Sequence, residues 1–323
     1  MKKEIIRRKK MPTEHLPNTI PESIRQIYAC RGVESSHQLE LSVGNLQGLN
    51  LQKNNEGDQA LKGLSEACQL LHFALTQNTH IIIVGDFDAD GATSTALMMV
   101  ALTLMGSVNH SFLVPNRFEY GYGLTPEIVD IAAKQGAQLL VTVDNGISCV
   151  AGVNRAKELG LQVLVTDHHL PGLELPKADA IVNPNQVGCP FPSKSLAGVG
   201  VAFYLMLALR SHLREKGYFV EHHIKEPNIA QLLDLVALGT VADVVSLDTN
   251  NRILVDQGLK RIRAGQTRPG IQALIEVANK NQQRLVASDF GFALGPRINA
   301  AGRLDDMSYG INCLLAPDLG SAR

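Results

Sequence analysis

The sequence lacks several features that would place it in a special class of protein. It contains no tryptophan, and phenylalanine and tyrosine make up its whole 5% aromatic content. No apolar run reaches the ~18–20 residues that a membrane-spanning helix needs, and no apolar segment follows the basic N-terminus to form a signal peptide. The five cysteines are odd in number, scattered and never spaced as C-x-x-C. We therefore expect reduced, buried thiols in a cytoplasmic protein.

An excess of charge of either sign is also missing, because 30 Lys and Arg residues face 31 Asp and Glu residues. The net charge of −1 excludes a general electrostatic attraction to nucleic acid. Phosphate binding has to be local, through metal ions or clustered arginines. The content of 45% hydrophobic and 19% charged residues is that of a globular protein, and 323 residues suffice for one large or two smaller domains.

The most informative stretch of the chain is a β-branched run followed by three acids. Residues 81–84 read Ile-Ile-Ile-Val, which predicts a buried strand of a parallel sheet. Asp86, Asp88 and Asp90 follow at a spacing of two, so in extended backbone their carboxylates point the same way. Such anions repel one another unless a cation lies among them, and oxygen ligands suit Mg²⁺ or Mn²⁺. An apolar helix is predicted next, at residues 96–105.

Two other interpretations of this stretch are weaker. A calcium-binding EF-hand loop that began at Asp86 would need a Glu at its twelfth position, where this chain has Leu97. An acidic surface turn does not explain three carboxylates between a buried strand and an apolar helix. The sequence therefore predicts a metal site that handles phosphate.

The middle of the chain alternates between strand and helix patterns. Further strands are predicted at residues 111–114, 137–143, 161–166 and 180–182, and helices at residues 58–77, from 126 and at 148–159. Such alternation predicts an α/β fold with a parallel sheet flanked by helices. A helical region follows, with helices at residues 197–216, 228–242, 251–264 and 270–280.

We divide the chain into three parts. Residues 1–57 are predicted to form an N-terminal arm, residues 58–220 the α/β domain, and residues 221–323 a helical portion that carries the last candidate ligand. The first ten residues hold six basic side chains and one acidic one. This run is typical of a solvated tail, with a contact to nucleic acid as the alternative.

More polar residues follow the predicted strands, and ligands bind at the carboxyl edge of such sheets. Asp144 follows one strand, and Asp167, His168 and His169 follow the next. Asp243 lies at the end of a long apolar helix predicted at residues 228–242. Taken singly, Asp144 is compatible with a helix cap and Asp243 with a surface residue. Together with the first three acids they supply enough oxygen and nitrogen ligands for two metal ions.

The chain contains two His-His pairs in different surroundings. His222-His223 lies in a charged segment between helices, which is typical of a solvated surface pair. His168-His169 ends a predicted buried strand and follows an acid. One imidazole of this pair can ligate a metal while the other donates to a phosphoryl oxygen, and Asp167 can orient or neutralise them.

Four motifs together resemble the DHH phosphoesterase superfamily. They are Gly-Asp-Phe-Asp-Ala-Asp-Gly at residues 85–91, Asp-Asn-Gly at 144–146, Asp-His-His at 167–169 and Ala-Asp at 242–243. Longer segments, at residues 115–124, 196–203, 238–245 and 295–304, are similar to the motifs of RecJ-type single-stranded-DNA-specific exonucleases. The resemblance implies metal-dependent phosphodiester hydrolysis, as 5′-to-3′ digestion of single-stranded DNA in DNA repair and recombination.

The resemblance also implies a centre of two divalent cations, Mn²⁺ or Mg²⁺. Asp144 would bridge the two ions. The first ion is assigned to Asp88, and the second to Asp90, His168 and Asp243. Two cations about 3.5–4 Å apart can lower the pKa of a bridging water and neutralise charge on the phosphoryl oxygens.

The catalytic residues implied by the resemblance are His169, Asp167 and Asp144, with His169 against the scissile phosphate. The chain departs from the superfamily at one point. Many members have a metal-binding His four residues before the first Asp of the Asp-x-Asp pair, where this chain has Val84. Asp86 is the candidate that completes the first site.

Candidate substrate contacts come from two of the longer segments. They are Arg117, Tyr120, Tyr122, Arg297, Asn299 and Arg303. Arginine can pair with phosphate and tyrosine can stack on a base. The alternatives are a structural Gly-Tyr-Gly turn at residues 121–123 and a loop at 295–304 that caps a helix. Gly198-Val-Gly200 opens a predicted helix, and for it we favour a packing role over anion binding.

RecJ-type enzymes continue into a second, glycine-rich domain and an oligonucleotide-binding fold, so the resemblance implies that this chain is the catalytic core alone. We therefore expect an exposed apolar surface that consists of Phe290, Phe292, Ile311, Leu314 and Leu315. The expected partner is single-stranded DNA, with a single-strand-binding protein or a helicase as candidate protein partners and no membrane. Two other functions stay open: a phosphodiesterase or phosphatase for small substrates, and a non-catalytic binding module.

Overall fold

The computed structural model describes residues 9–48, 60–114, 121–304 and 306–323, with the backbone alone at residues 303 and 304. The chain forms two compact units, Met1–Asn45 and Leu46–Arg323. The described part of the first unit contains α1 (Glu22–Ala29) and the 3-10 helices η1 (Ser36–Leu39) and η2 (Val43–Asn45). The division of the chain at residues 57 and 220 stays a prediction.

The second unit is built on a parallel sheet of five strands in the order β2-β1-β3-β4-β5. The strands are β1 (Ile81–Gly85), β2 (His110–Leu113), β3 (Leu139–Val143), β4 (Gln162–Thr166) and β5 (Ala180–Val182). Every residue of β1 and β3 is buried, as expected of apolar strands covered on both faces. The predicted parallel sheet is confirmed, and its central strands end level with one another, with Gly85 opposite Val143 and Val143 opposite Thr166.

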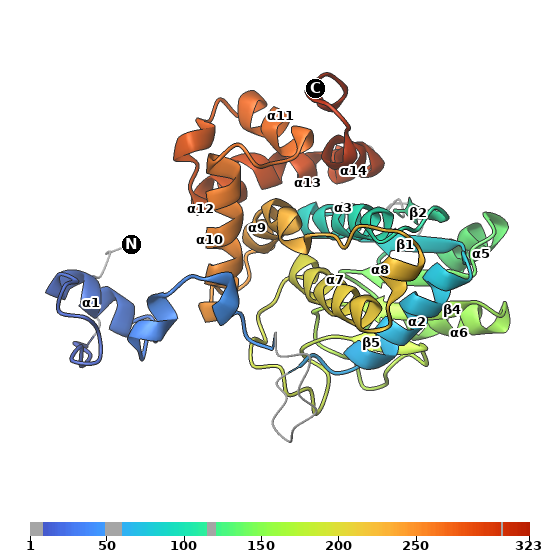
Figure 1. Cartoon of the computed structure of the whole chain (residues 1–323), viewed down its shortest axis with the longest axis horizontal. Helices are drawn as coiled ribbons and strands as arrows, with labels where there is room; N and C mark the ends of the chain where they lie inside the picture. The colour runs from blue at the N-terminus through green and yellow to red at the C-terminus, as the bar shows by residue number, and fades with distance from the viewer. Residues whose placement is uncertain (1–8, 49–59, 115–120, 305) are drawn as a thin grey trace, which may run out of the picture. The chain divides into compact units, whose positions relative to one another are not determined.

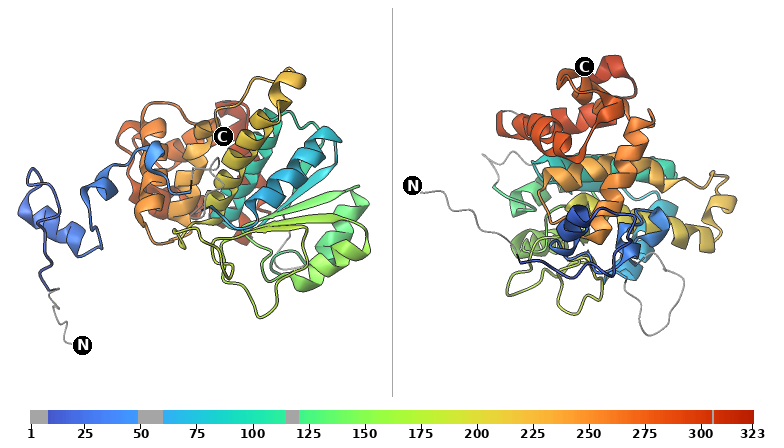
Figure 2. Two further views of the ribbon diagram at one scale, coloured as in Figure 1. Left: turned by 60° about the horizontal axis from the view of Figure 1, so that its bottom comes forward. Right: turned by 90° about the vertical axis from the view of Figure 1, so that its left-hand side faces the viewer.

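Helices cover both faces of this sheet (Figure 1, Figure 2). The helices α5 (Pro126–Lys134) and α6 (Val150–Glu158) cover one face, and α2 (Leu64–Thr76), α3 (Ala89–Leu104) and α7 (Gly198–Glu215) cover the other. On the first face, alternate strand residues such as Ile82 and Leu140 share a core with Val129 and Val153 of the helices. The N-termini of α3 and α7 lie at the carboxyl edge of the sheet, which is where ligands bind in such folds.

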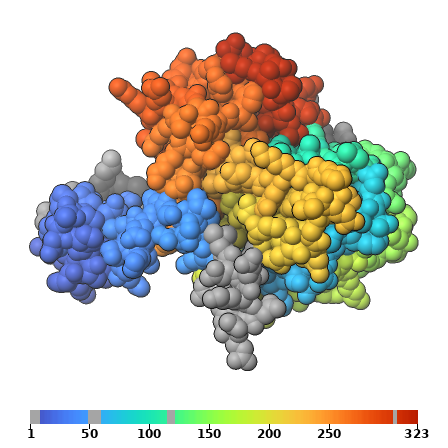
Figure 3. All heavy atoms as spheres, in the orientation of Figure 1, coloured from blue at the N-terminus to red at the C-terminus, as the bar shows by residue number. Residues whose placement is uncertain are grey.

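The rest of the chain is helical, as predicted. Its elements are α8 (Tyr218–Glu221), η3 (Ile229–Leu232), α9 (Leu233–Ala242), α10 (Thr249–Arg263), α11 (Pro269–Val277), η4 (Gln282–Arg284), α12 (Ala287–Asp289), the π-helical turn η5 (Phe290–Leu294), α13 (Gly295–Leu304), α14 (Ser308–Leu315) and α15 (Leu319–Ala322). The apolar helix α9 is buried along most of its length between α3, α7 and α10. In Figure 3 the C-terminal helices, orange to red, pack directly on the yellow segment that precedes them. Residues 221–323 are predicted to be helical, but no bounds are predicted for individual helices beyond residue 280.

The predicted apolar surface around residues 290–315 is wrong for most of its members. Phe290, Ile311 and Leu314 are buried and Leu315 is half-buried. The reason is that η5 and α13 pack on α9, and α14 packs on α3. Phe292, which is 87% exposed, is the one residue of the five that faces outward.

Two expectations about the whole chain can be compared with the structure. Among the described residues, no helix is long and apolar enough to cross a membrane. Of the cysteines, Cys68 and Cys189 are buried, and Cys30, Cys149 and Cys313 are half-buried. The expected burial therefore holds fully for two of the five thiols.

Candidate metal centre

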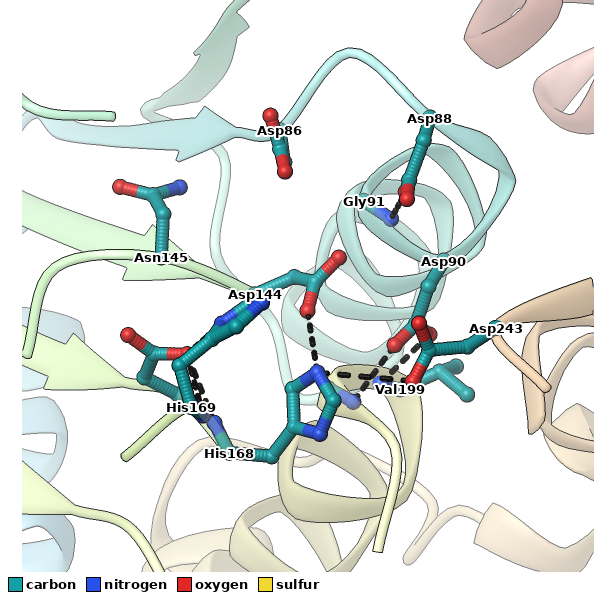
Figure 4. Close-up of polar contacts among 12 residues, drawn as sticks. Asp86, Asp88, Asp90, Gly91, Asp144, Asn145, His168, His169, Val199 and Asp243 are labelled. Carbon is teal, nitrogen blue, oxygen red and sulfur yellow. Dashed lines mark hydrogen bonds and ion pairs between the residues drawn. The ribbon is translucent and has the colours of Figure 1, made fainter. Parts of the chain in front are cut away.

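The loop after β1 brings the first acids to the carboxyl edge of the sheet (Figure 4). Asp88 is the N-cap of α3, where its Oδ1 accepts a hydrogen bond of 2.9 Å from Gly91 N. The helix therefore begins at Ala89, and its predicted start at residue 96 is wrong. Aspartate is a favoured N-cap because it satisfies a free N–H of the first turn. Asp90 consequently lies inside the helix, and the extended backbone assumed for the three acids ends before it.

The N-terminus of α7 holds the carboxylate of Asp90. Oδ2 accepts a hydrogen bond from Gly198 N at 2.6 Å, and Oδ1 accepts one from Val199 N at 3.0 Å. Asp90 is fully buried, and a helix N-terminus is a favourable place for an anion. Gly239 of α9 leaves room for it, since a Cβ at position 239 would lie 2.9 Å from Asp90 Oδ1.

Asp144 follows β3 and is also buried. Its φ of +62° is left-handed, a conformation that Asp and Asn adopt more readily than most residues. Its N–H donates to Thr166 O at 3.0 Å. The next residue, Asn145, donates through Nδ2 to Val84 O at 3.1 Å and to Val143 O at 2.9 Å. These bonds fix the acid on the ends of three neighbouring strands.

His168 faces two acids from the end of β4. Its Nε2 lies 3.1 Å from Asp144 Oδ1 and 3.5 Å from Oδ2 of Asp243, the C-cap residue of α9. All three atoms are buried, and none has a hydrogen-bond partner of suitable geometry among the residues that the structure describes. Burial, together with the neighbouring His169, lowers the pKa of His168 to about 4. The neutral imidazole keeps a lone pair for a metal ion.

Asp167 fixes the second histidine. His169 Nδ1 lies 2.7 Å from Asp167 Oδ1, and the same carboxylate accepts backbone N–H bonds from His168, His169 and Ile147. The bond to Asp167 raises the pKa of His169 to about 8, against the effect of burial. Burial alone would raise the pKa of Asp167, but the bonds from His169 and the backbone hold it below its ordinary value. Since the His169 side chain is 46% exposed, its other nitrogen can reach a ligand.

The buried carboxylates of the site repel one another. Burial, and then the neighbouring Asp88, raises the pKa of both Asp86 and Asp243 to about 7. The pKa values of Asp90 and Asp144 are raised well above the ordinary range, first by burial and then by Asp243 and Asp90, respectively. A cation among these groups would replace the repulsion by attraction.

Three sets of potential ligand atoms each lie within 4.8 Å of one another. The sets are Asp86, Asp88 and Asp144; Asp90, His168 and Asp243; and Asp144, His168 and His169. Asp144 and His168 each belong to two sets, which suits two neighbouring ions with a shared ligand. Carboxylate and imidazole donors, with unpartnered atoms at the centre, fit a divalent cation such as Mn²⁺.

The predicted substrate contacts differ in their surroundings. Arg117 and Tyr120 lie outside the described residues, as does the side chain of Arg303. Arg297 is exposed on α13, and its Nη1 donates to Ala293 O at 2.6 Å. Asn299 lies on the same helix, but its Oδ1 accepts a hydrogen bond from Ala89 N at 2.7 Å. One predicted contact thus reaches the loop that carries the first acids.

Tyr122 lies beside the metal ligands. Its hydroxyl donates to Asp144 O at 3.5 Å. Its ring stands edge-on to those of Phe87 and His169, with 5.9 Å and 6.2 Å between the ring centroids. Since the residue is 51% exposed, part of its side chain next to the site is accessible to a ligand.

Several groups that hold the site in place were missed in the sequence. Packing was favoured for Gly198-Val-Gly200, whereas the N–H groups of residues 198 and 199 hold the Asp90 carboxylate. Asn183 Nδ2 donates to His169 O at 3.0 Å, and Asn185 Nδ2 donates to His168 O at 2.6 Å. In the sequence, Asn183 and Asn185 follow the predicted strand at residues 180–182, and this position predicts polar groups at the sheet edge. Their contact with the His pair depends on β5 lying beside β4.

Gly198→Ala is expected to weaken metal binding. A Cβ at position 198 would lie 2.6 Å from Cβ and Oδ1 of Asp144, and such overpacking costs about 1–3 kcal/mol. Displacing groups that support metal ligands lowers affinity about 10- to 100-fold, and we expect that range for Mn²⁺ by calorimetry. Gly200→Ala is the matched control, since its Cβ first meets the flexible Leu196 side chain at 3.0 Å. Equal affinities in the two variants would contradict this geometry.

Known proteins are similar in sequence to this chain over nearly its whole length. The family model described as "DHH family, N-terminal domain" matches residues 80–240. The "Single-stranded-DNA-specific exonuclease RecJ" of Salmonella typhimurium is 60% identical over 321 residues, which are 99% of this chain and 54% of that protein. The protein of the same name from Thermus thermophilus is 38% identical over 263 residues, which are 81% of this chain and 36% of that protein. The chain thus spans about half the length of its Salmonella relative.

Solved structures share the fold. One described as exonuclease RecJ bound to manganese is 37% identical, with a TM-score of 0.70 over 81% of this chain and 63% of that one. RecJ from Thermus thermophilus in complex with Mn²⁺ is 33% identical, with a TM-score of 0.73 over 91% of this chain and 39% of that one. Sequence, fold and the acids and histidines at one sheet edge agree, and the chain belongs to the DHH family, within its RecJ branch.

Proposed function

We propose that this chain carries the active site of a metal-dependent exonuclease that digests single-stranded DNA from the 5′ end, in DNA repair and recombination. The observation that carries the proposal is the convergence of Asp144 Oδ1, His168 Nε2 and Asp243 Oδ2 as buried, unpartnered atoms in the described part of the chain. The names of the relatives support the substrate class, and the manganese-bound structure supports the metal.

Two divalent cations, Mn²⁺ or Mg²⁺, fit the donor set. We assign one ion to Asp86, Asp88 and Asp144, and the other to Asp90, His168 and Asp243, with Asp144 between the two. When bound, such ions lower the pKa of a water and neutralise charge on the phosphoryl group. The chain contributes rigid placement, since these ligands are held at the carboxyl ends of β1, β3 and β4, at the N-terminus of α3 and at the C-terminus of α9.

His169 is proposed to donate a hydrogen bond to the scissile phosphate. Its Nδ1 is engaged by Asp167, so Nε2 is the ring atom available to a ligand. The bond to Asp167 raises the pKa of His169 to about 8, which favours the form that carries a proton on both nitrogens. A donor in this place stabilises charge that develops on the phosphoryl oxygens in the transition state. Asp167 acts through His169, by holding the ring in one orientation.

Tyr122→Ala is expected to weaken the binding of short single strands. A base stacked on the exposed part of the ring is worth about 1–3 kcal/mol, so Kd should rise about 5- to 150-fold. Tyr122→Phe keeps the ring and should bind as the unaltered protein does. The measurement is a titration with a phosphorothioate-linked trinucleotide that resists hydrolysis. Unchanged affinity in Tyr122→Ala would show that this ring does not stack on a base.

The proposed activity is tested with single strands labelled at either end, incubated with the chain and Mn²⁺. We expect labelled mononucleotide as the first product from the 5′-labelled strand, a ladder from the 3′-labelled strand, and no product with EDTA. Turnover of oligoribonucleotides, polyphosphate or cyclic dinucleotides instead would favour a small-substrate phosphodiesterase. Bound Mn²⁺ without turnover of any of these would favour a non-catalytic binding module.

The proposed protein partners and the place of the reaction follow from the substrate. Single-stranded DNA is produced by helicases and covered by single-strand-binding protein, so these are the protein partners that we propose, with the reaction in the cytoplasm. Co-sedimentation of the chain with purified single-strand-binding protein tests the first of them. Arg117, Tyr120, Arg297 and Arg303 stay predicted backbone or base contacts.

A further inference from the structure

One hydrogen bond joins helix α13 to the loop that carries the metal-site acids. Asn299 Oδ1 accepts it from Ala89 N at 2.7 Å, across 210 residues of sequence. Ala89 is buried, with 1% of its surface exposed. Its N–H lies between Asp88 and Asp90, which belong to different sets of potential metal ligands.

A second contact presses α13 against the same loop. A Cβ at Gly302 would collide with the carbonyl oxygen of Phe87, so the helix backbone approaches the loop as closely as a glycine allows. Gly302 and Asn299 are three residues apart and lie on one face of α13. The helix therefore touches the loop on both sides of Asp88, at Phe87 and at Ala89.

The bond at Ala89 satisfies a donor that α3 cannot satisfy by itself. Ala89 is the first residue of α3, and the first N–H groups of a helix have no partner within it. The Asp88 side chain caps Gly91 N, which leaves Ala89 N to Asn299. Without that acceptor a buried N–H would lack a partner, and the loop would gain freedom to rotate between Asp88 and Asp90.

Asn299 is also a predicted contact for a backbone phosphate, and the two roles use different atoms. The contact with the loop uses Oδ1 as an acceptor, whereas a phosphate would need Nδ2 as a donor. Substitution by Asp keeps an acceptor and removes the donor. Substitution by Leu removes both and keeps the size of the side chain. The two substitutions therefore separate the roles.

We propose that Asn299 is a positioning residue for the metal-binding loop, and that its bond to Ala89 N sets the relative orientation of the Asp88 and Asp90 carboxylates. The inference rests on the proposed function, because it requires that these acids hold the metal ions. Helix α13 would then help to position the metal ligands before any substrate is bound.

Calorimetric titration of the chain with Mn²⁺ in the absence of DNA is the test. Asn299→Leu is expected to lower the affinity for at least one ion by about 10-fold or more, as for other groups that support metal ligands. Asn299→Asp should stay within about threefold of the unaltered protein, because it retains the acceptor. Asn312→Leu, on the exposed surface of α14, is the matched control and should change nothing.

Hydrogen exchange of the segment around Ala89 gives a readout that is independent of the metal. Its amide should exchange at least about 10-fold faster in Asn299→Leu than in Asn299→Asp, because only the latter keeps the acceptor. If Asn299→Leu does not fold, Asn299→Ser replaces it in both measurements with the same expectations.

The possible outcomes separate the inference from the proposed function. Unchanged Mn²⁺ affinity and amide exchange in Asn299→Leu, with weaker DNA binding, would overturn the inference and leave a substrate contact. Failure of the unaltered chain to bind Mn²⁺ would overturn the proposed function, and the inference with it. Weaker Mn²⁺ binding in Asn299→Leu with rescue by Asn299→Asp supports both.

Discussion

Asp144→Ala is expected to abolish hydrolysis of single-stranded DNA and to release both metal ions. Asp144 belongs to the ligand set assigned to the first ion, and its Oδ1 lies 3.1 Å from Nε2 of His168, a ligand assigned to the second, whereas Asp88 and Asp243 belong to one set each. Loss of a terminal ligand loosens one ion, and loss of the shared ligand loosens both. Removal of a single group that stabilises a transition state costs about 10²–10³ in kcat, so we expect a loss of at least that size. Calorimetry should show Mn²⁺ binding fall together with turnover.

A second substitution separates this effect from backbone strain. The left-handed φ of +62° at Asp144 is tolerated better by Asn than by Ala. Asp144→Asn should therefore fold like the unaltered protein and still lose both ions, because its side chain is uncharged. Asp130→Asn is the control, since that acid is partly exposed on α5 and pairs with Arg155 at 2.8 Å. Two bound metals and normal turnover in Asp144→Asn would show that the site is wrongly assigned.

The sheet could be predicted because the signal for each strand lies in its own residues. Residues 81–84 are all β-branched and residues 139–143 are all apolar or Thr, which suits strands that helices cover on both faces. The polar residues that follow such strands then meet at one edge. For this reason Asp144 and His168 could be predicted as neighbours, and Nε2 of His168 lies 3.1 Å from Asp144 Oδ1.

The supports of the site could not be predicted because they come from distant segments. The partners of Asp90 lie 108 and 109 residues along the chain, and Asn299 lies 210 residues from Ala89. One local signal was available, since Asp88 is of a residue type that is favoured at the N-cap. It would have placed the start of α3 at Ala89 and Asp90 in its first turn.

Burial in the helical region could not be predicted for a related reason. Phe290 and Phe292 are two residues apart, and both look equally apolar in the sequence. Phe290 is fully buried, whereas Phe292 is 87% exposed. The π-helical turn η5 and its contacts with α9 decide which of the two rings is covered. These contacts depend on where α9 lies, and the apolar pattern of residues 290–294 carries no information about that position.

His169→Ala is expected to slow hydrolysis while leaving metal binding nearly intact. His169 lies in one of the three ligand sets, but its Nδ1 is committed to Asp167 at 2.7 Å and its side chain is the most exposed of that set. A donor to the phosphoryl oxygen acts as charge develops in the transition state, so kcat should fall about 10²–10³-fold. The Kd for Mn²⁺ should stay within about threefold, because the less exposed ligands Asp144, His168 and Asp243 remain.

Two further variants make this prediction specific to the position and to the hydrogen bond. His222→Ala removes an exposed histidine whose ring lies tilted against that of Tyr218, with 4.2 Å between the centroids, and should leave both Mn²⁺ binding and kcat unchanged. His169→Gln keeps a donor and should recover part of kcat, which a purely structural role of His169 would not explain. If His169→Ala instead lost one Mn²⁺ per chain, the third ligand set would be a true metal site. His169 would then act as a ligand, and the donor to the phosphate would have to come from another residue.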